Sequence, residues 1–218
     1  MQKKIWDTKK LIVMALFCAL AFLSTALFRI PVVLWLKFDP KDCLIAIGGM
    51  LYGPAAALVM AVAVSFLELI TISDTGVYGM LMNVIATSLF VLPSAFMYRH
   101  RRRLSTAIIG LVLGALVATG GMLLWNWLIV PLYMPTMSRA DIVPLLWSAF
   151  LPFNLFKTAL NAVLTVLLYK GVVSALRAAR LVPKTDGARR GISVPVVVVS
   201  LFLLASLILV LLVWRGVL

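Results

Sequence analysis

A small set of polar side chains interrupts the long apolar segments of this chain. The set comprises Glu68, Asn83, Asn126, Asn154, Lys157 and Asn161. An ionisable or amide group in the middle of a lipid bilayer costs roughly 3 kcal/mol, so residues of this kind are candidates for function. Amides and a lysine donate and accept hydrogen bonds, which is the chemistry of ligand recognition rather than of catalysis.

Three of these residues share one face of a predicted helix. Asn154, Lys157 and Asn161 are spaced i, i+3 and i+7, which places them on one side of a helix. With Asn83 and Asn126, they could line a pocket that opens to the outside and suits a neutral heterocycle rich in carbonyl and ring-nitrogen groups. The alternative is that the amides tie helices together, as polar residues do in membrane bundles.

Lys157 lies deep in an apolar segment and therefore needs a partner. The candidates are a bound ligand and Glu68. If the chain were an enzyme of the membrane interior, its catalysis would rest on these two residues alone.

Patterns typical of catalytic or metal sites are absent from the sequence. There is no carboxylate pair, Ser-His dyad or His-Glu zinc pattern, and the only histidine, His100, lies among arginines. The two cysteines, Cys18 and Cys43, do not have metal-ligand spacing. We therefore predict that the protein is not an enzyme and holds no metal or cofactor.

The amino-acid composition indicates that the polar residues are positioned by transmembrane helices. Of the 218 residues, 64% are hydrophobic and 12% are charged, whereas soluble domains have about 25% charged residues. The net charge of +13 could indicate nucleic-acid binding, but Lys and Arg lie beside the apolar segments, where they orient helices and contact anionic lipids. We predict an all-α membrane protein whose partner is the lipid bilayer, with no nucleic acid.

Apolar segments of about 20 residues predict the transmembrane helices. The long segment 43–72 is divided in two near Tyr52-Gly53-Pro54, because proline ends or kinks a helix. Six helices form one substrate-binding domain over residues 1–180, a basic linker occupies 181–193, and a seventh helix at 194–214 is an accessory anchor. The predicted segments are 11–28, 43–72, 77–98, 104–132, 143–173 and 194–214.

The basic residues predict the orientation of the chain. Fourteen of the twenty Lys and Arg residues lie on the side that carries the N-terminus, which the positive-inside rule places in the cytoplasm. Segment 29–42 then lies outside, where its apolar character predicts that it folds back onto the helices. The turn at Gly53 would lie near the cytoplasmic face, although the sequence beside it contains no charged residue that would indicate this side.

Several short motifs occur in a recognisable order over residues 10–175. They are Lys37-Phe38-Asp39 with Asp42, Tyr52-Gly53-Pro54-Ala55-Ala56, Asn83, Trp125-Asn126-Trp127 with Pro131-Leu132-Tyr133, and Pro152-Phe153-Asn154-Leu155-Phe156-Lys157. This set resembles the riboflavin-specific S components of the energy-coupling-factor (ECF) transporters. The resemblance implies a six-helix bundle with an outward-facing pocket that is capped by the loop after the first helix.

The resemblance also implies the ligand and the residues that hold it. It implies high-affinity binding and uptake of riboflavin across the bacterial plasma membrane by a multi-pass protein, with riboflavin as the transported ligand. Asn126, Asn154 and Lys157 are the implied flavin contacts. The further candidates are Asn83, Lys37, Phe38 and Asp39.

A pattern of small residues in the first helix is a candidate docking site. Ala15 and Ala19 form a small-xxx-small pattern, which allows close approach of two helices. In the family, the corresponding alanines pack on a transmembrane coupling subunit that joins two ABC-type ATPases. The implied energy source is therefore the partner ATPases.

The chain departs from the family pattern at two places. Val64-Ser65 stands where some members have a Lys-Asn pair, and the seventh helix lies beyond the six-helix core. Two alternatives therefore stay open. One is the same architecture with another vitamin or precursor, such as a thiamine-like or pantothenate-like compound, and the other is a membrane assembly or sensor protein.

Overall fold

A computed structural model of the chain describes residues 7–182 and 194–214. Among these residues, six helices are long and apolar enough to cross a membrane, which confirms the predicted all-α membrane fold. The elements in chain order are α1 (Thr8–Phe28), β1 (Ile30–Val33), β2 (Leu36–Phe38), α2 (Lys41–Tyr52), α3 (Pro54–Thr71), α4 (Gly76–His100), α5 (Leu104–Tyr133), α6 (Arg139–Leu145), the π-helical turn η1 (Leu146–Phe150), α7 (Leu151–Ala178) and α8 (Val194–Trp214).

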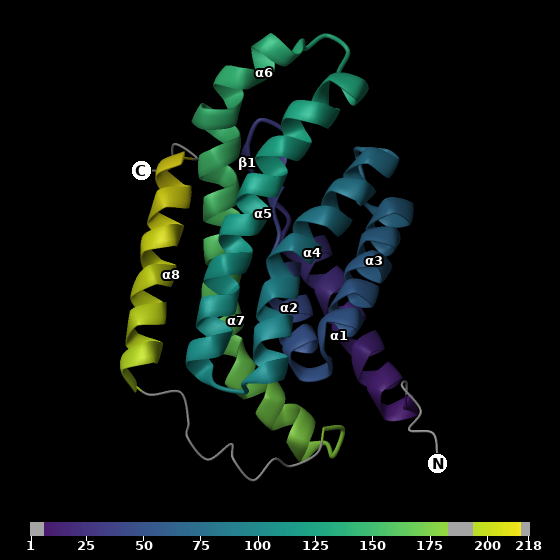
Figure 1. The fold of residues 1–218 in the computed structure, drawn as a ribbon, viewed down its shortest axis with the longest axis vertical. Coiled ribbons are helices and arrows are strands. Elements are labelled where there is room, and N and C mark those ends of the chain that lie inside the picture. Colours follow the sequence, from purple (N-terminus) through teal and green to yellow (C-terminus); the bar gives the residue numbers. More distant parts are fainter. Residues whose placement is uncertain (1–6, 183–193, 215–218) are drawn as a thin grey trace.

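The helices form a bundle around α2 (Figure 1). This helix contacts α1, α3, α4 and α7, and its apolar residues Ile45 and Ile47 are fully buried. Large apolar side chains on the outside of the bundle, such as Leu27 and Phe66, are exposed, as expected for residues that face lipid.

α2 is shorter than the full span expected for its segment. Its 12 residues rise about 18 Å, whereas the hydrocarbon core of a bilayer is about 30 Å thick. The preceding segment folds back as predicted and forms the antiparallel hairpin β1–β2. The hairpin and α2 together therefore occupy the part of the bundle that a single transmembrane helix would span.

The turn between α2 and α3 depends on Gly53. This residue has φ +93°, in the left-handed region that side chains with a Cβ rarely adopt. The Nζ of Lys10 lies 6.0 Å from the ring centroid of Tyr52, and a Cβ on Gly53 would lie 3.8 Å from the Arg99 side chain. Basic residues of α1 and α4 thus flank the turn, although its own sequence has no charge.

α5 is held close to α4 by two glycines. A Cβ at Gly114 would lie 2.1 Å from the carbonyl oxygen of Phe90, and one at Gly110 would lie 2.6 Å from Cα of Ser94. Only glycine allows this approach of the two backbones.

α8 lies on the outside of the bundle against α7 (Figure 1). Its bounds are those of the seventh helix predicted at 194–214, and only Ser200 on it is buried. The predicted linker 181–193 lies outside the described residues except for Leu181 and Val182.

Candidate functional site

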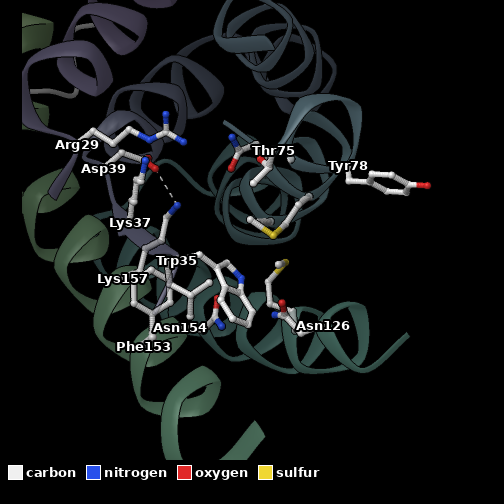
Figure 2. Close-up of a pocket in the computed structure, with 16 residues that line it drawn as sticks. Arg29, Trp35, Lys37, Asp39, Thr75, Tyr78, Asn126, Phe153, Asn154 and Lys157 are labelled. Atoms are coloured by element: carbon white, nitrogen blue, oxygen red, sulfur yellow. Dashed lines mark hydrogen bonds and ion pairs between the residues drawn. The ribbon is translucent and has the colours of Figure 1, made fainter. Parts of the chain in front are cut away.

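A cavity lies between the hairpin, α4, α5 and α7 (Figure 2). Its volume is about 60 Å³. Its apolar lining includes Leu36, Met82, Met122 and Phe153. Its polar lining includes Arg29, Trp35, Lys37, Asp39, Thr75, Asn83, Asn126, Asn154 and Lys157.

Most of the residues selected from the sequence meet at this cavity. Six of the seven proposed flavin contacts line it, namely Lys37, Asp39, Asn83, Asn126, Asn154 and Lys157. Phe38 does not, because its ring packs edge-to-face on Phe156 of α7, with 6.0 Å between the ring centroids.

Asn161 does not line the cavity either, although it was expected to share it with Asn154 and Lys157. Seven residues along a helix correspond to about 10 Å, which carries Asn161 beyond the cavity. Its side chain is fully buried, donates to the carbonyl oxygen of Asp39 and accepts from the backbone N–H of Cys43. Asn161 therefore ties the end of the hairpin to α7, which is the helix-tying role considered as the alternative.

Two amides in the cavity are oriented by their own helices. Nδ2 of Asn126 donates to the carbonyl oxygen of Met122 at 2.7 Å, and Nδ2 of Asn154 donates to that of Phe150 at 2.8 Å. In the part of the chain that the structure describes, Oδ1 of Asn126 is buried and has no hydrogen-bond partner, and the same holds for Nε1 of Trp35. Both residues line the cavity, so each brings an unpartnered polar atom to its wall.

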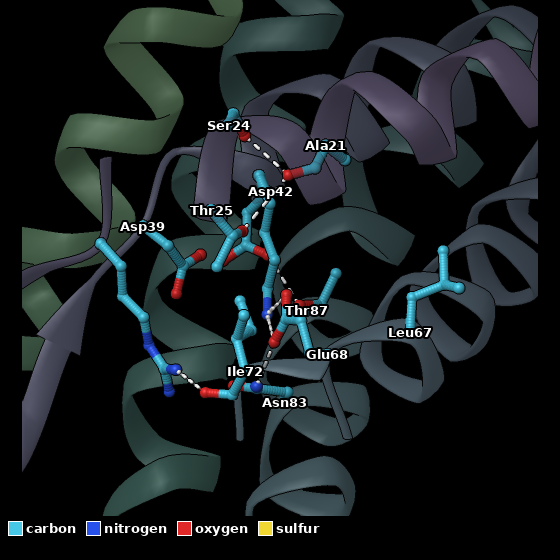
Figure 3. A network of polar contacts seen from close by, with 12 residues as sticks. Ala21, Ser24, Thr25, Asp39, Asp42, Leu67, Glu68, Ile72, Asn83 and Thr87 are labelled. Carbon is cyan, nitrogen blue, oxygen red and sulfur yellow. Dashed lines mark hydrogen bonds and ion pairs between the residues drawn. The ribbon is translucent and has the colours of Figure 1, made fainter. Parts of the chain in front are cut away.

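Lys157 pairs with Asp39 and not with Glu68, the protein partner considered from the sequence. Its Nζ lies 3.0 Å from Oδ2 of Asp39. Glu68 instead accepts from Lys41 at 2.7 and 2.8 Å and from Asn83 at 2.7 Å (Figure 3). The sequence predicts Lys41 in the outside segment 29–42, whereas the hairpin brings this lysine into the bundle, where it is fully buried and pairs with Glu68.

The charges around the cavity balance one another. Asp42 is buried and accepts from the Thr87 hydroxyl at 2.6 Å, next to the two buried ion pairs. The group contains four cationic and four anionic side chains, so its formal charge is zero. These are Arg29, Lys37, Lys41 and Lys157, and Asp39, Asp42, Glu68 and Asp74.

At the rim, two contacts fasten the hairpin to the loop between α3 and α4. Lys37 pairs with Asp74, and Nη1 of Arg29 donates to the carbonyl oxygen of Ile72 at 2.7 Å. The hydrogen bond from Lys37, together with the charges of Lys37 and Arg29, holds the pKa of the exposed Asp74 carboxyl below its usual range.

Comparison with known proteins decides the family. The model of a family described as "ECF transporter, substrate-specific component" matches residues 9–169. This chain belongs to that family. The substrate-specific component of a transporter is a substrate-binding membrane subunit, and the resemblance seen in the motifs is confirmed.

Curated relatives of this S component are named riboflavin transporters. RibU of Staphylococcus aureus (strain TCH60) is 27% identical over 179 residues, which cover 78% of this chain and 94% of RibU. FmnP of Bacillus subtilis (strain 168) is 30% identical over 171 residues, which cover 74% of this chain and 90% of FmnP.

A solved structure described as the S component of a bacterial ECF transporter has the same fold. Its TM-score is 0.66 at 26% sequence identity, and the match covers 79% of this chain and 99% of that chain. α8 of this S component lies outside the residues that the family model matches.

Several cavity residues of this S component were not predicted from the sequence. They include Arg29, Trp35 and Phe153. A signal was present for Phe153, which is adjacent to Asn154, and for Trp35, which lies two residues before Lys37. Val64 and Ser65, where the chain differs from the family pattern, do not line the cavity.

Proposed function

We propose that the protein binds riboflavin with high affinity from outside the cell and is the substrate-specificity subunit for its uptake. The observation that carries this proposal is the amide-lined cavity, to whose wall Asn126 brings an unpartnered acceptor and Trp35 an unpartnered donor. One edge of the flavin ring alternates carbonyl, ring-nitrogen and N–H groups, which complement such a lining. The names of the two curated relatives point to the same ligand.

Riboflavin requires the hairpin to move. The cavity volume of about 60 Å³ is small beside the roughly 300–1,000 Å³ of pockets that hold drug-sized ligands. The hairpin forms one wall of the cavity and is not a membrane helix, and it lies at the outer end of the bundle (Figure 1). Entry of the ligand therefore includes a displacement of β1–β2 from α4 and α7.

Energy for uptake comes, in this proposal, from a transmembrane coupling subunit and two ABC-type ATPases. The sequence contains no Gly-rich phosphate loop of its own. Residues 1–180 form the substrate-binding domain, in a bacterial plasma membrane and with the N-terminus in the cytoplasm. The basic residues Lys10 and Arg99 at the α2–α3 turn support this orientation, because they add positive charge to the end of the bundle that carries the N-terminus.

Titration of the purified protein with riboflavin tests the proposal. We expect saturable quenching of flavin fluorescence, and we expect Asn126→Ala, Asn154→Ala and Lys157→Ala each to weaken binding by about tenfold, since each removes a hydrogen bond to the ligand. Ser206→Ala, on α8 and away from the cavity, is the control and should bind like the wild type.

Two results would count against the proposal. Unchanged affinity in both asparagine variants would exclude the assigned cavity. A wild-type protein that does not bind riboflavin but is stabilised against heat by a thiamine-like or pantothenate-like compound would support the same architecture for another vitamin.

A further inference from the structure

α8 carries an apolar stripe that faces the bundle. Leu204, Leu207, Leu211 and Trp214 pack against a cluster formed by Phe38, Phe156 and Leu160. Their spacing of i, i+3, i+7 and i+10 places them on one side of the helix. Phe202, on the other side, is 70% exposed.

The stripe ends beside the hairpin. The Trp214 ring packs edge-to-face on Phe156, with 6.1 Å between the ring centroids, and Phe156 packs in the same way on Phe38 of β2. α8 also contacts β1, whose Val32 packs against the same cluster. The last turn of α8 therefore supports both strands and the part of α7 beneath them.

These aromatic contacts are adjacent to the ion pair of the cavity. Phe38 directly precedes Asp39, and Phe156 directly precedes Lys157, so the two residues that pair across the cavity follow the two rings that pack together. Loss of the Trp214 ring would weaken the packing of Phe156 against Phe38 and would therefore destabilise the closed position of the hairpin.

We propose that α8 fastens the hairpin, with Trp214 as a positioning residue that keeps β1–β2 closed and limits the rates at which the ligand enters and leaves. Trp214 does not line the cavity, so its effect passes through Phe156 and Phe38. The kinetic part of this inference rests on the proposed function, because the hairpin has to move to admit riboflavin.

The test compares Trp214→Ala with Phe202→Ala in the full-length protein. Phe202→Ala removes an aromatic ring from the same helix without touching the cluster, and Trp214→Phe keeps a ring against Phe156. Association and dissociation of riboflavin are followed by flavin fluorescence. Hydrogen exchange of the backbone amides of residues 30–38 is measured without ligand, so this readout does not depend on riboflavin.

In Trp214→Ala we expect both rates to rise about fivefold, since an edge-to-face aromatic contact is worth about 1 kcal/mol. The dissociation constant should change little, because closure of the hairpin is weakened with and without ligand. Hairpin amides should exchange faster than in the wild type. Phe202→Ala should behave like the wild type, and Trp214→Phe should come close to it.

Several results would overturn the inference. One is equal rates and equal hairpin exchange in Trp214→Ala and Phe202→Ala, and another is a weaker affinity in Trp214→Ala with no rise in the association rate. If Trp214→Ala does not fold, Leu207→Ala replaces it under the same criteria. Faster hairpin exchange in a protein that never binds riboflavin would support the fastening and reject the proposed function.

Discussion

The ion pair between Asp39 and Lys157 joins the hairpin to α7 in a buried place. The two side chains retain only 7% and 11% exposure. Removal of one partner leaves the other buried without compensation, which costs about 3–5 kcal/mol. Removal of both leaves neither member of the pair buried without its partner, so the two substitutions should not be additive.

We therefore predict that Asp39→Ala and Lys157→Met each lower the thermal unfolding temperature of the ligand-free protein. The double variant should be more stable than the sum of the single effects indicates. Thermal unfolding in mild detergent measures all three variants. Additive losses would show that the pair does not stabilise the hairpin.

The exposed pair between Lys37 and Asp74 should respond to pH and salt. The lowered pKa of Asp74 means that the pair stabilises the folded state at neutral pH and is lost as the pH falls through that lowered value, in the acid range. Because the pair is exposed, Asp74→Asn should raise the dissociation rate of riboflavin at neutral pH by at most about threefold.

Salt provides the check on this prediction. The difference between Asp74→Asn and the wild type should shrink as the ionic strength increases, since salt screens exposed charges. A difference that is the same at low and high salt would mean that the substitution acts through something other than the ion pair.

The α4–α5 contact positions Asn126 and Met122, the part of the cavity wall that α5 supplies. Gly114→Ala places a methyl group 2.1 Å from the carbonyl oxygen of Phe90, so the helices have to separate. We predict a loss of roughly 1–3 kcal/mol of stability and weaker riboflavin binding. Thermal unfolding and ligand titration measure the two effects.

Gly120 on the same helix is the matched control for this prediction. A Cβ there meets nothing within 4 Å, and alanine is a better helix former than glycine. Gly120→Ala should therefore be neutral or slightly stabilising. Equal behaviour of the two variants would contradict the assigned role of the close helix contact.

At the scale of the whole molecule, α1 and α8 lie on opposite sides of the bundle (Figure 1). Ala15 and Ala19 are exposed on α1, so α8 leaves free the surface proposed for docking. We predict that Ala15→Trp combined with Ala19→Trp abolishes riboflavin uptake by cells and leaves binding by the purified protein unchanged, because the bulky rings keep the coupling subunit away from α1.

Ala205 on α8 is exposed as well, and Ala205→Trp should leave both uptake and binding intact. Normal uptake by the double α1 variant would exclude the docking surface. Loss of uptake in Ala205→Trp as well would mean that any bulky addition to the lipid-facing surface disturbs the assembly.

The sequence by itself determined the class of the protein and most of its helices. The last helix has the predicted bounds, and the division at Gly53-Pro54 is where α2 ends and α3 begins. Asn154 and Lys157 share a face as predicted and line one cavity. These features depend on local composition, periodicity and proline or glycine chemistry, all of which are present in short stretches of sequence.

Only the tertiary structure decided which polar groups meet. Lys157 pairs with Asp39, 118 residues away in the chain, and the turn at Gly53 obtains its charges from Lys10 and Arg99 of other helices. Asn161 stabilises the hairpin instead of facing the cavity. The physical reason is that a buried charge or amide bonds to whichever partner the packing brings within about 3 Å. The residues next to the buried group in the sequence do not identify that partner.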